Sequence, residues 1–307
     1  MIWTAERNMD QGALVTSMYE RAGPVPCERK AIMAGGLPGA DTARVLRQAG
    51  IDASRYLTIN IDAILAEIAA RRLIPHVDGL TPLEAADLAH AEAQFLAKRL
   101  GMRALADDRN VIWDISFASQ HAVESWIAAH RRAGYTIRGM FVELSIQESV
   151  RRSAAMHRRG HDDYRQGRGY GGRFIPAGAI RALADDTGSR PVRDGVPGAP
   201  DAPYSARDPG VPGDVTTMIR AYLAGEMTLK ALAGRFRSRH WRAVPPVTPP
   251  GMEEAAAAID DPEPYVPGSF DDVVRAYDLR WITDPDYEAL AAAAAVGIQG
   301  QRGDPRA

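Results

Sequence analysis

The sequence lacks the features that would place it in several common classes of protein. Its 307 residues include one cysteine, Cys27, which excludes an internal disulfide framework and a metal site of several thiolates. No apolar run approaches the ~18 residues that a membrane-spanning helix needs, and the acidic Glu6 and Asp10 near the N-terminus are unlike a secretory signal. The formal net charge is only −2, which gives no general attraction to nucleic acid or to an acidic membrane. We therefore expect a cytoplasmic protein that binds neither.

What the sequence does contain is a repeated alternation of strand and helix patterns. Hydrophobic residues make up 46% of the chain, as in globular proteins. Apolar runs that suit buried parallel strands are expected at 31–34, 56–60, 111–114 and 137–144. Helical patterns are expected at 42–49, 63–72, 81–100, 119–132 and 146–159. This alternation predicts an α/β fold, a doubly wound parallel sheet with helices on both faces.

Composition divides the chain into four parts. Residues 1–30 form an N-terminal helical segment, with a short helix expected around 11–21, and residues 31–184 hold the α/β pattern. Residues 185–215 are dense in proline, glycine and aspartate and have no helix or strand period, which predicts a linker. Residues 216–307 are predicted to be a mostly helical C-terminal region.

The helical C-terminal region contains a weak internal repeat. Arg-Ala-Tyr occurs at 220–222 and again at 275–277, and each copy is followed by a hydrophobic residue and a threonine, Thr228 or Thr283. A threonine in that place suits a helix N-cap, so each copy predicts a pair of helices. A packing or protein-contact module is favoured over DNA binding, because no helix that could read a DNA groove is identifiable.

The stretch after the first predicted strand has the frame of a phosphate-binding loop. Residues 35–42 form a Gly/Pro turn between a strand and a helix, with the spacing G-x-x-x-x-G-K-[ST] counted from the first residue. Ala40 stands at the second glycine, Asp41 at the lysine, and Thr42 at the residue whose hydroxyl contacts magnesium. The candidate nucleotide-binding residues are Gly35, Gly36, Leu37, Pro38, Gly39, Ala40, Asp41 and Thr42.

Two of these residues oppose phosphate binding. Alanine at position 40 disfavours the positive φ that glycine allows, and its methyl group stands where backbone should approach a phosphate. Asp41 reverses the charge of the missing lysine, and a like-charge contact at 4 Å costs ~4 kcal/mol at an effective dielectric near 20. We therefore expect ATP–magnesium to bind weakly or not at all, unless Arg44 or Arg47 of the following helix compensates.

Two carboxylates lie at the ends of predicted strands: Asp62 follows the second strand, and Asp114 is the last residue of the third. Asp62 could accept the proton of a substrate hydroxyl, as phosphoryl transfer requires of a base, and it suits the N-cap of the next helix equally well. Asp114 could hold a substrate or a magnesium-bound water, although an aspartate at a strand end is also a common turn former. The pattern makes both residues catalytic candidates and leaves their structural roles open.

Arginines and glycines are concentrated in two adjoining segments, 151–160 and 171–176. Phosphoryl transfer depends on positioning and charge neutralisation, so guanidinium groups over the phosphates suit it. The flanking glycines would let this region close as a lid. A solvated basic loop is the alternative, and Asp162 and Asp163 weaken any case for nucleic-acid binding.

In combination, the motifs between about residues 31 and 184 resemble the zeta toxin family of P-loop kinases, and especially its long actinobacterial forms. The matching stretches are GGLPGA at 35–40, LTIN at 57–60 with Asp62, DGLTPLEA at 78–85, LAKRL at 96–100, RNVIWD at 109–114, HDDY at 161–164 and GGRFIP at 171–176. The resemblance implies a fold like that of small-molecule kinases. It also implies ATP- and magnesium-dependent phosphorylation of the 3′-hydroxyl of UDP-N-acetylglucosamine, and restraint by an antitoxin.

The resemblance implies roles for individual residues. Asp62 matches the catalytic base, and Asp114 matches an acidic residue that contacts the sugar. Arg173 matches one of two lid arginines that touch the nucleotide phosphates, and Arg158 matches the other better than Arg159 does. Thr42 matches the loop residue whose hydroxyl contacts the magnesium ion in the family.

The family pattern is incomplete. Gly-Lys is replaced by Ala40-Asp41, Ile61 and Leu65 stand where proline and lysine are usual, and residues 185–215 offer no last strand after the lid. Three hypotheses follow: a pseudokinase with lost or strongly reduced activity, an active kinase that uses ATP and magnesium, and an interaction module that acts through the helical tail. The expected partners are a nucleotide or nucleotide sugar and an antitoxin or other protein. If the protein is inactive, no cofactor is expected.

Overall fold

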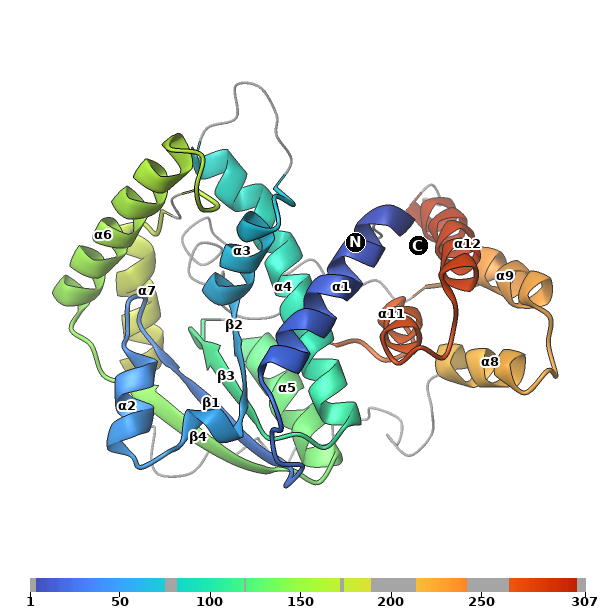
Figure 1. The fold of residues 1–307 in the computed structure, drawn as a ribbon, viewed down its shortest axis with the longest axis horizontal. Helices are drawn as coiled ribbons and strands as arrows, with labels where there is room; N and C mark the ends of the chain where they lie inside the picture. Colours follow the sequence, from blue (N-terminus) through green and yellow to red (C-terminus); the bar gives the residue numbers. More distant parts are fainter. Residues whose placement is uncertain are drawn as a thin grey trace. The chain divides into compact units, whose positions relative to one another are not determined.

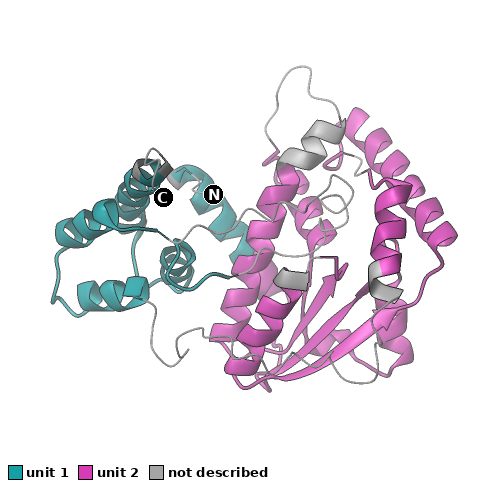
Figure 2. Cartoon of the chain, turned by 180° about the vertical axis from the view of Figure 1, so that it is seen from behind, with its two compact units in different colours: residues 1–16, 203–246, 265–307 teal, residues 17–202, 247–264 magenta. Residues whose placement is uncertain are grey.

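The computed structural model describes residues 4–74, 82–118, 120–171, 174–188, 214–241 and 265–302. The chain divides into two compact units, which Figure 2 colours separately. The first, here called the α/β unit, is formed by residues 17–202 and 247–264. The second, here called the helical unit, is formed by residues 1–16, 203–246 and 265–307.

A four-stranded parallel sheet is the centre of the α/β unit, as the alternation of the sequence predicts (Figure 1). Its strands are β1 (Lys30–Gly36), β2 (Leu57–Asn60), β3 (Val111–Ile115) and β4 (Thr136–Val142). Their order across the sheet is β2-β3-β1-β4, and every pair is parallel. The carboxyl ends of the strands, where ligands bind in folds of this kind, therefore lie at one edge of the sheet.

Seven helices precede, connect or follow these strands in the described residues up to 188. They are α1 (Ala5–Arg21), α2 (Thr42–Gln48), α3 (Ile61–Ala70), α4 (Pro82–Ala106), α5 (Gln120–Arg132), α6 (Ile146–Arg165) and α7 (Ala177–Gly188). A short 3-10 turn, η1 (Ala53–Arg55), precedes β2. The boundary between the two units falls within α1, after residue 16.

Helices cover both faces of the sheet. On one face, Leu46 of α2 packs in an apolar cluster with Ile32 of β1 and Ile112 of β3. On the other, Trp126 of α5 packs against Trp113 of β3, with ring centroids 4.4 Å apart. Because Ile112 and Trp113 are consecutive in a strand, their side chains point to opposite faces. The doubly wound arrangement is confirmed.

Some helix ends differ from the predicted ones. The helix expected at 63–72 runs from 61 to 70, because its N-cap is Asn60 and not Asp62. The Asn60 side chain accepts a hydrogen bond from Ala63 N at 2.8 Å, and Asp62 instead lies in the first turn. The helices expected to end at 100 and 159 continue to 106 and 165.

Helix α7 was not predicted from the sequence. It extends to Gly188, so the first residues of the predicted 185–215 linker are helical. Residues 189–213 of that linker lie outside the described residues, and so does the helix start that was expected at Thr81.

The helical unit contains the repeat that the sequence indicates. Among the described residues from 214 onward its helices are α8 (Asp214–Leu223), α9 (Leu229–Ser238), α11 (Asp271–Asp278) and α12 (Asp284–Arg302). Thr228 caps α9 by accepting a hydrogen bond from Ala231 N at 3.2 Å, and Thr283 Oγ1 accepts one from Asp286 N at 3.4 Å. The equivalent helices pack together, α8 on α11 and α9 on α12. No helix among the described residues is both long and apolar enough to cross a membrane.

A buried histidine completes the aromatic core behind β3. His130 is fully buried, its Nε2 accepts a hydrogen bond from Trp113 Nε1 at 3.3 Å, and its Nδ1 lies 2.7 Å from Trp126 O. Both contacts are satisfied only by the neutral ring with the proton on Nδ1. Burial therefore lowers the pKa of His130 from 6.5 to about 4.

This histidine gives the α/β unit a defined pH dependence. Between pH 6.5 and pH 4 the unfolded chain binds a proton at His130 that the folded chain does not, so stability falls as the pH falls. The loss is about 2 kcal/mol between pH 6.5 and pH 5. We predict that His130→Gln removes this part of the slope in urea unfolding followed by tryptophan fluorescence. His157→Gln, at a half-exposed histidine of α6, is the control. Equal slopes for wild type and His130→Gln would contradict the prediction.

Candidate functional site

The loop between β1 and α2 starts where two strands press closely on its glycines. A Cβ added at Gly35 would lie 1.6 Å from the carbonyl oxygen of Ile115, and one added at Gly36 would lie 2.4 Å from that of Val142. No side chain fits at either position. Gly39, at the turn of the loop, has a φ of +82°, which glycine adopts without strain. The sheet thus requires glycine at two positions of the loop, and the turn itself requires it at a third, independently of any ligand.

Asp41 is the N-cap of α2. Its side chain accepts a hydrogen bond from Arg44 N at 2.9 Å, and the residue is exposed. An aspartate at an N-cap satisfies one of the helix's unpaired amides and interacts favourably with the positive end of the helix. The charge that looks misplaced in a phosphate loop therefore has a local structural role.

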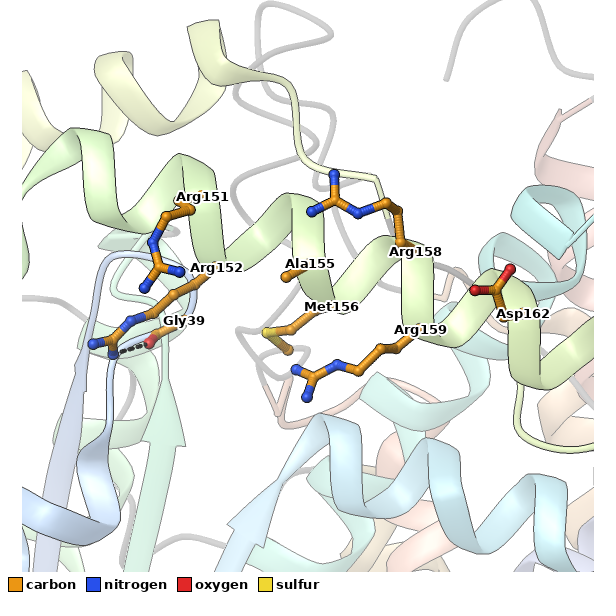
Figure 3. Close-up of a pocket in the computed structure, with 8 residues that line it drawn as sticks. All are labelled: Gly39, Arg151, Arg152, Ala155, Met156, Arg158, Arg159 and Asp162. Carbon is orange, nitrogen blue, oxygen red and sulfur yellow. Dashed lines mark hydrogen bonds between the residues drawn. The ribbon is translucent and has the colours of Figure 1, made fainter.

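Helix α6 holds the same loop from the other side. Ser149 Oγ donates a hydrogen bond to Pro38 O at 2.8 Å, and Arg152 Nη1 donates one to Gly39 O at 2.9 Å (Figure 3). A Cβ at Gly39 would lie only 2.8 Å from the Arg152 Cβ. The carbonyl groups of the loop are thus fixed on α6, and an arginine takes up a place beside a loop that has no lysine.

Asp114, near the end of β3, connects two other elements of the site through its carboxylate. Its Oδ2 accepts one hydrogen bond from Thr42 Oγ1 and another from Asn60 Nδ2, both at 2.9 Å. Thr42 is the first residue of α2, and Asn60 is the last of β2. The sequence prediction that Thr42 and Asp114 belong to one site fits this geometry. Asn60 was not singled out, although an amide at a strand end before a helix is a recognisable capping signal.

Asp62, the candidate base, lies in the first turn of α3, two residues after Asn60. The hydroxyl of Tyr170 donates a hydrogen bond to Asp62 Oδ1 at 3.2 Å. Tyr170 was not singled out from the sequence either, because the two residues are 108 positions apart. The acidic part of the site therefore joins α2, β2, β3, α3 and the loop that follows α6.

An arginine-lined cavity of 640 Å³ lies along α6, next to Gly39. Apart from Gly39, the residues that line it form two adjacent rows along one side of α6 (Figure 3). They are Arg151, Arg152, Ala155, Met156, Arg158, Arg159 and Asp162. Four guanidinium groups against one carboxylate give the cavity a positive charge, which suits an anionic ligand.

The four arginines of the cavity are not equivalent. Arg151 donates two hydrogen bonds to Glu148, at 2.7 Å and 2.6 Å, and Arg152 donates one at 2.6 Å. These hydrogen bonds lower the pKa of Glu148 to about 2. Arg158 and Arg159 are exposed, and neither forms a hydrogen bond or ion pair within the described part of the chain. Their charge is therefore available to a ligand. Arg173, the other predicted lid arginine, lies outside the described residues.

A second cavity of 580 Å³ opens on the α2 side of the sheet and reaches Thr42 and Asp114. Its walls come from α2, from the segment 50–54 and from Thr58 and Ile112. Most of these side chains are small or apolar, so this cavity differs in character from the arginine-lined one.

The frame of the phosphate loop can be counted from Gly36 as well as from Gly35, because β1 continues through Gly36. From Gly36, the lysine position is Thr42 and the hydroxyl position is Ala43. Either count finds no lysine. The nearest cations on the helix, Arg44 and Arg47, are both exposed.

The residues present fit ATP–magnesium poorly. The loop supplies no lysine in either frame, and the Thr42 hydroxyl is committed to Asp114. No cluster of three or more histidine, cysteine or carboxylate side chains that could hold a metal ion occurs among the described residues. Magnesium commonly binds through one or two carboxylates together with substrate phosphates, so here it would depend on Asp114 and on a nucleotide that the loop does not favour.

Comparison with known proteins gives one result. A protein-family model described as Zeta toxin matches residues 22–187, which is just over half of the chain. The match includes the loop, both carboxylates and α6. No curated protein and no solved structure matches the chain.

The capping role of Asp41 leads to a stability prediction. Asp41→Ala should lower the free energy of unfolding by about 1 kcal/mol, as loss of an N-cap commonly does. Asp41→Asn keeps a capping oxygen and should lower it by much less. Urea unfolding of both variants measures the difference. Equal losses for the two variants would mean that charge, and not capping, is what Asp41 contributes.

Proposed function

We propose, from the premise that this chain belongs to the zeta toxin family, that it is a kinase-fold protein with lost or strongly reduced ATP-dependent phosphotransfer. We also propose that the carboxylate residues at the ends of β2 and β3 still bind a nucleotide sugar. The observation that carries the proposal is the loop before α2, which has no lysine and whose Asp41 carboxylate caps the helix. The family match supports the kinase-like fold; the loss of activity is our inference.

The charge of the loop supports weak nucleotide binding. A P-loop lysine attracts the β- and γ-phosphates, whereas Asp41 brings a negative charge to the same loop. The repulsion is worth ~4 kcal/mol per unit charge pair at 4 Å and an effective dielectric near 20. Because Asp41 is exposed, solvent screens part of this repulsion, but solvent cannot restore the missing attraction.

The carboxylate side of the site supports binding of a hydroxyl-rich ligand. Asp62, Asp114 and Asn60 all lie at the carboxyl ends of β2 and β3 or at the start of α3. Carboxylates accept hydrogen bonds from hydroxyl groups, and such charge-assisted bonds are stronger than neutral ones. Arg158 and Arg159, whose charges are not paired within the described residues, suit the phosphates of a nucleotide sugar.

An active kinase is the second candidate, and the arginine-lined cavity is the observation that favours it. Arg152 is hydrogen-bonded to the loop itself, at Gly39 O, so its guanidinium could stand in for the lysine. Against this, the Arg152 Nε is already bound to Glu148 at 2.6 Å, which neutralises much of its charge. We therefore favour the inactive form.

Restoring the lysine tests the proposal. Wild type should bind ATP–magnesium weakly or not at all in calorimetric titration. Ala40→Gly with Asp41→Lys restores the frame counted from Gly35, and Asp41→Gly with Thr42→Lys restores the second glycine and the lysine of the frame counted from Gly36. At least one pair should strengthen binding by about tenfold or more, since a phosphate–lysine contact is gained. Micromolar binding by wild type would overturn the proposal.

A charge control separates a restored loop from a general gain of positive charge. Glu20 lies on the exposed side of α1, outside the site, and Glu20→Lys changes the net charge by the same amount as Asp41→Lys. We expect it to leave ATP affinity unchanged. If Glu20→Lys binds ATP as well as the loop variants do, the gain is not due to the loop.

The carboxylate side has its own test. UDP-N-acetylglucosamine should bind wild type, and Asp114→Asn should weaken that binding by about tenfold, because a charge-assisted hydrogen bond becomes a neutral one. Asp114→Asn keeps the shape and an acceptor for Thr42 and Asn60. Glu20→Gln is the control for loss of a carboxylate elsewhere. Equal affinity of wild type and Asp114→Asn would remove Asp114 from the ligand site.

A further inference from the structure

A hydrogen bond between the Tyr170 hydroxyl and the Asp62 carboxylate joins the loop after α6 to the start of α3. The phenol donates to Asp62 Oδ1 at 3.2 Å, and Tyr170 is half-buried. Asp62 is the carboxylate on which a substrate hydroxyl is expected to place its proton. The Tyr170 hydroxyl therefore donates its hydrogen bond to the same carboxylate that a ligand hydroxyl would use.

The loop that carries Tyr170, residues 166–171, begins as the C-terminal cap of α6, where the amides of Gln166, Gly167 and Arg168 donate hydrogen bonds to carbonyl groups of the last turn, and it contains three glycines. Gly167, Gly169 and Gly171 have φ values of +71°, +67° and +105°, a region that other residues rarely adopt. A Cβ at Gly167 would meet no atom within 4 Å, although the Gly167 amide donates a hydrogen bond to Tyr164 O at 2.9 Å. Arg168 is exposed and bonds only locally, to Asp163 and Gln166, at 2.9 Å and 2.8 Å.

We propose that Tyr170 is a latch that occupies the acceptor side of the site until a hydroxyl-bearing ligand displaces it. A phenol and a sugar hydroxyl present the same O–H donor to a carboxylate, so the two compete for Asp62. When the ligand is absent, Tyr170 holds the 166–171 loop against α3. When the ligand binds, its hydroxyl takes the Asp62 oxygen, and the loop is released. The inference rests on the proposed function, because it takes Asp62 as part of the ligand site.

The latch sets a cost on ligand binding. A ligand binds the open form, so its apparent affinity is reduced by the fraction of molecules that are open. Removing the phenol hydroxyl should therefore strengthen ligand binding and loosen the loop. A tyrosine that only helped to hold the ligand would have the opposite effect on affinity.

Trypsin cleavage tests the latch without any ligand. Arg165 and Arg168 are exposed on either side of the loop's first glycine, and the rate of cleavage after each can be followed by mass spectrometry. We expect cleavage about fivefold to tenfold faster in Tyr170→Phe than in wild type, which is the scale of one hydrogen bond to a charged acceptor. Asp62→Ala should have a similar effect.

Two comparisons keep this test specific. The double variant Tyr170→Phe with Asp62→Ala should be cleaved no faster than either single variant, because both remove the same bond. Tyr164→Phe removes a phenol hydroxyl from the same helix end that makes no hydrogen bond in the described residues, and it should be cleaved at the wild-type rate. An unchanged rate in Tyr170→Phe, or additive effects in the double variant, would overturn the latch.

Titration with UDP-N-acetylglucosamine separates the latch from the proposed function. Tyr170→Phe should bind about fivefold tighter than wild type, and Tyr164→Phe should bind as wild type does. Weaker binding by Tyr170→Phe would overturn displacement of the latch. If neither protein binds the nucleotide sugar while the proteolysis result holds, the contact between Tyr170 and Asp62 is supported, and both the proposed ligand and its competition with Tyr170 are overturned.

Discussion

The carboxylate of Asp114 is the contact on which the arrangement of the site depends. One of its oxygens accepts hydrogen bonds from Thr42 at the start of α2 and from Asn60 at the end of β2. Asn60 in turn caps α3 through Ala63 N, and this sets the turn on which Asp62 lies. A single carboxylate on β3 thus couples the loop that would bind a phosphate to the residues that would bind an acceptor. Losing it would leave two polar side chains without their shared acceptor.

The altered loop makes physical sense once its contacts are considered together. Its glycines are required by close approach to β3, β4 and α6, so the shape of a phosphate loop persists without a phosphate. Asp41 would repel a nucleotide, yet it stabilises α2 as an N-cap. A chain that no longer needed to bind ATP could keep the loop for its fold and replace the lysine at little cost in stability. Retained fold and lost charge are therefore compatible.

Much of this could be predicted from the sequence, because it depends on local patterns. Apolar runs separated by helical stretches predicted the parallel sheet and both layers of helices. Asp114 was expected at the end of a strand and lies one residue before the end of β3, and Asp62 was expected after a strand and lies in the first turn of α3. Capping was predicted less well: Asp62 and Asn60 are both good N-caps, and only the backbone of β2 decides between them. The contacts of Tyr170 and Arg152 could not be predicted. Each joins residues more than 100 positions apart, at 3.2 Å and 2.9 Å, and no local pattern encodes which loop meets which helix.

The central claim is that this kinase-like site does not transfer phosphate from ATP. Incubating the wild-type protein with ATP, magnesium and UDP-N-acetylglucosamine, and examining the nucleotide sugar by mass spectrometry, tests it most directly. The account predicts an unmodified nucleotide sugar after prolonged incubation. A product heavier by one phosphate group, formed by wild type and absent with Asp62→Ala, would contradict it. That result would mean that arginines of α6 replace the missing lysine in binding the phosphates.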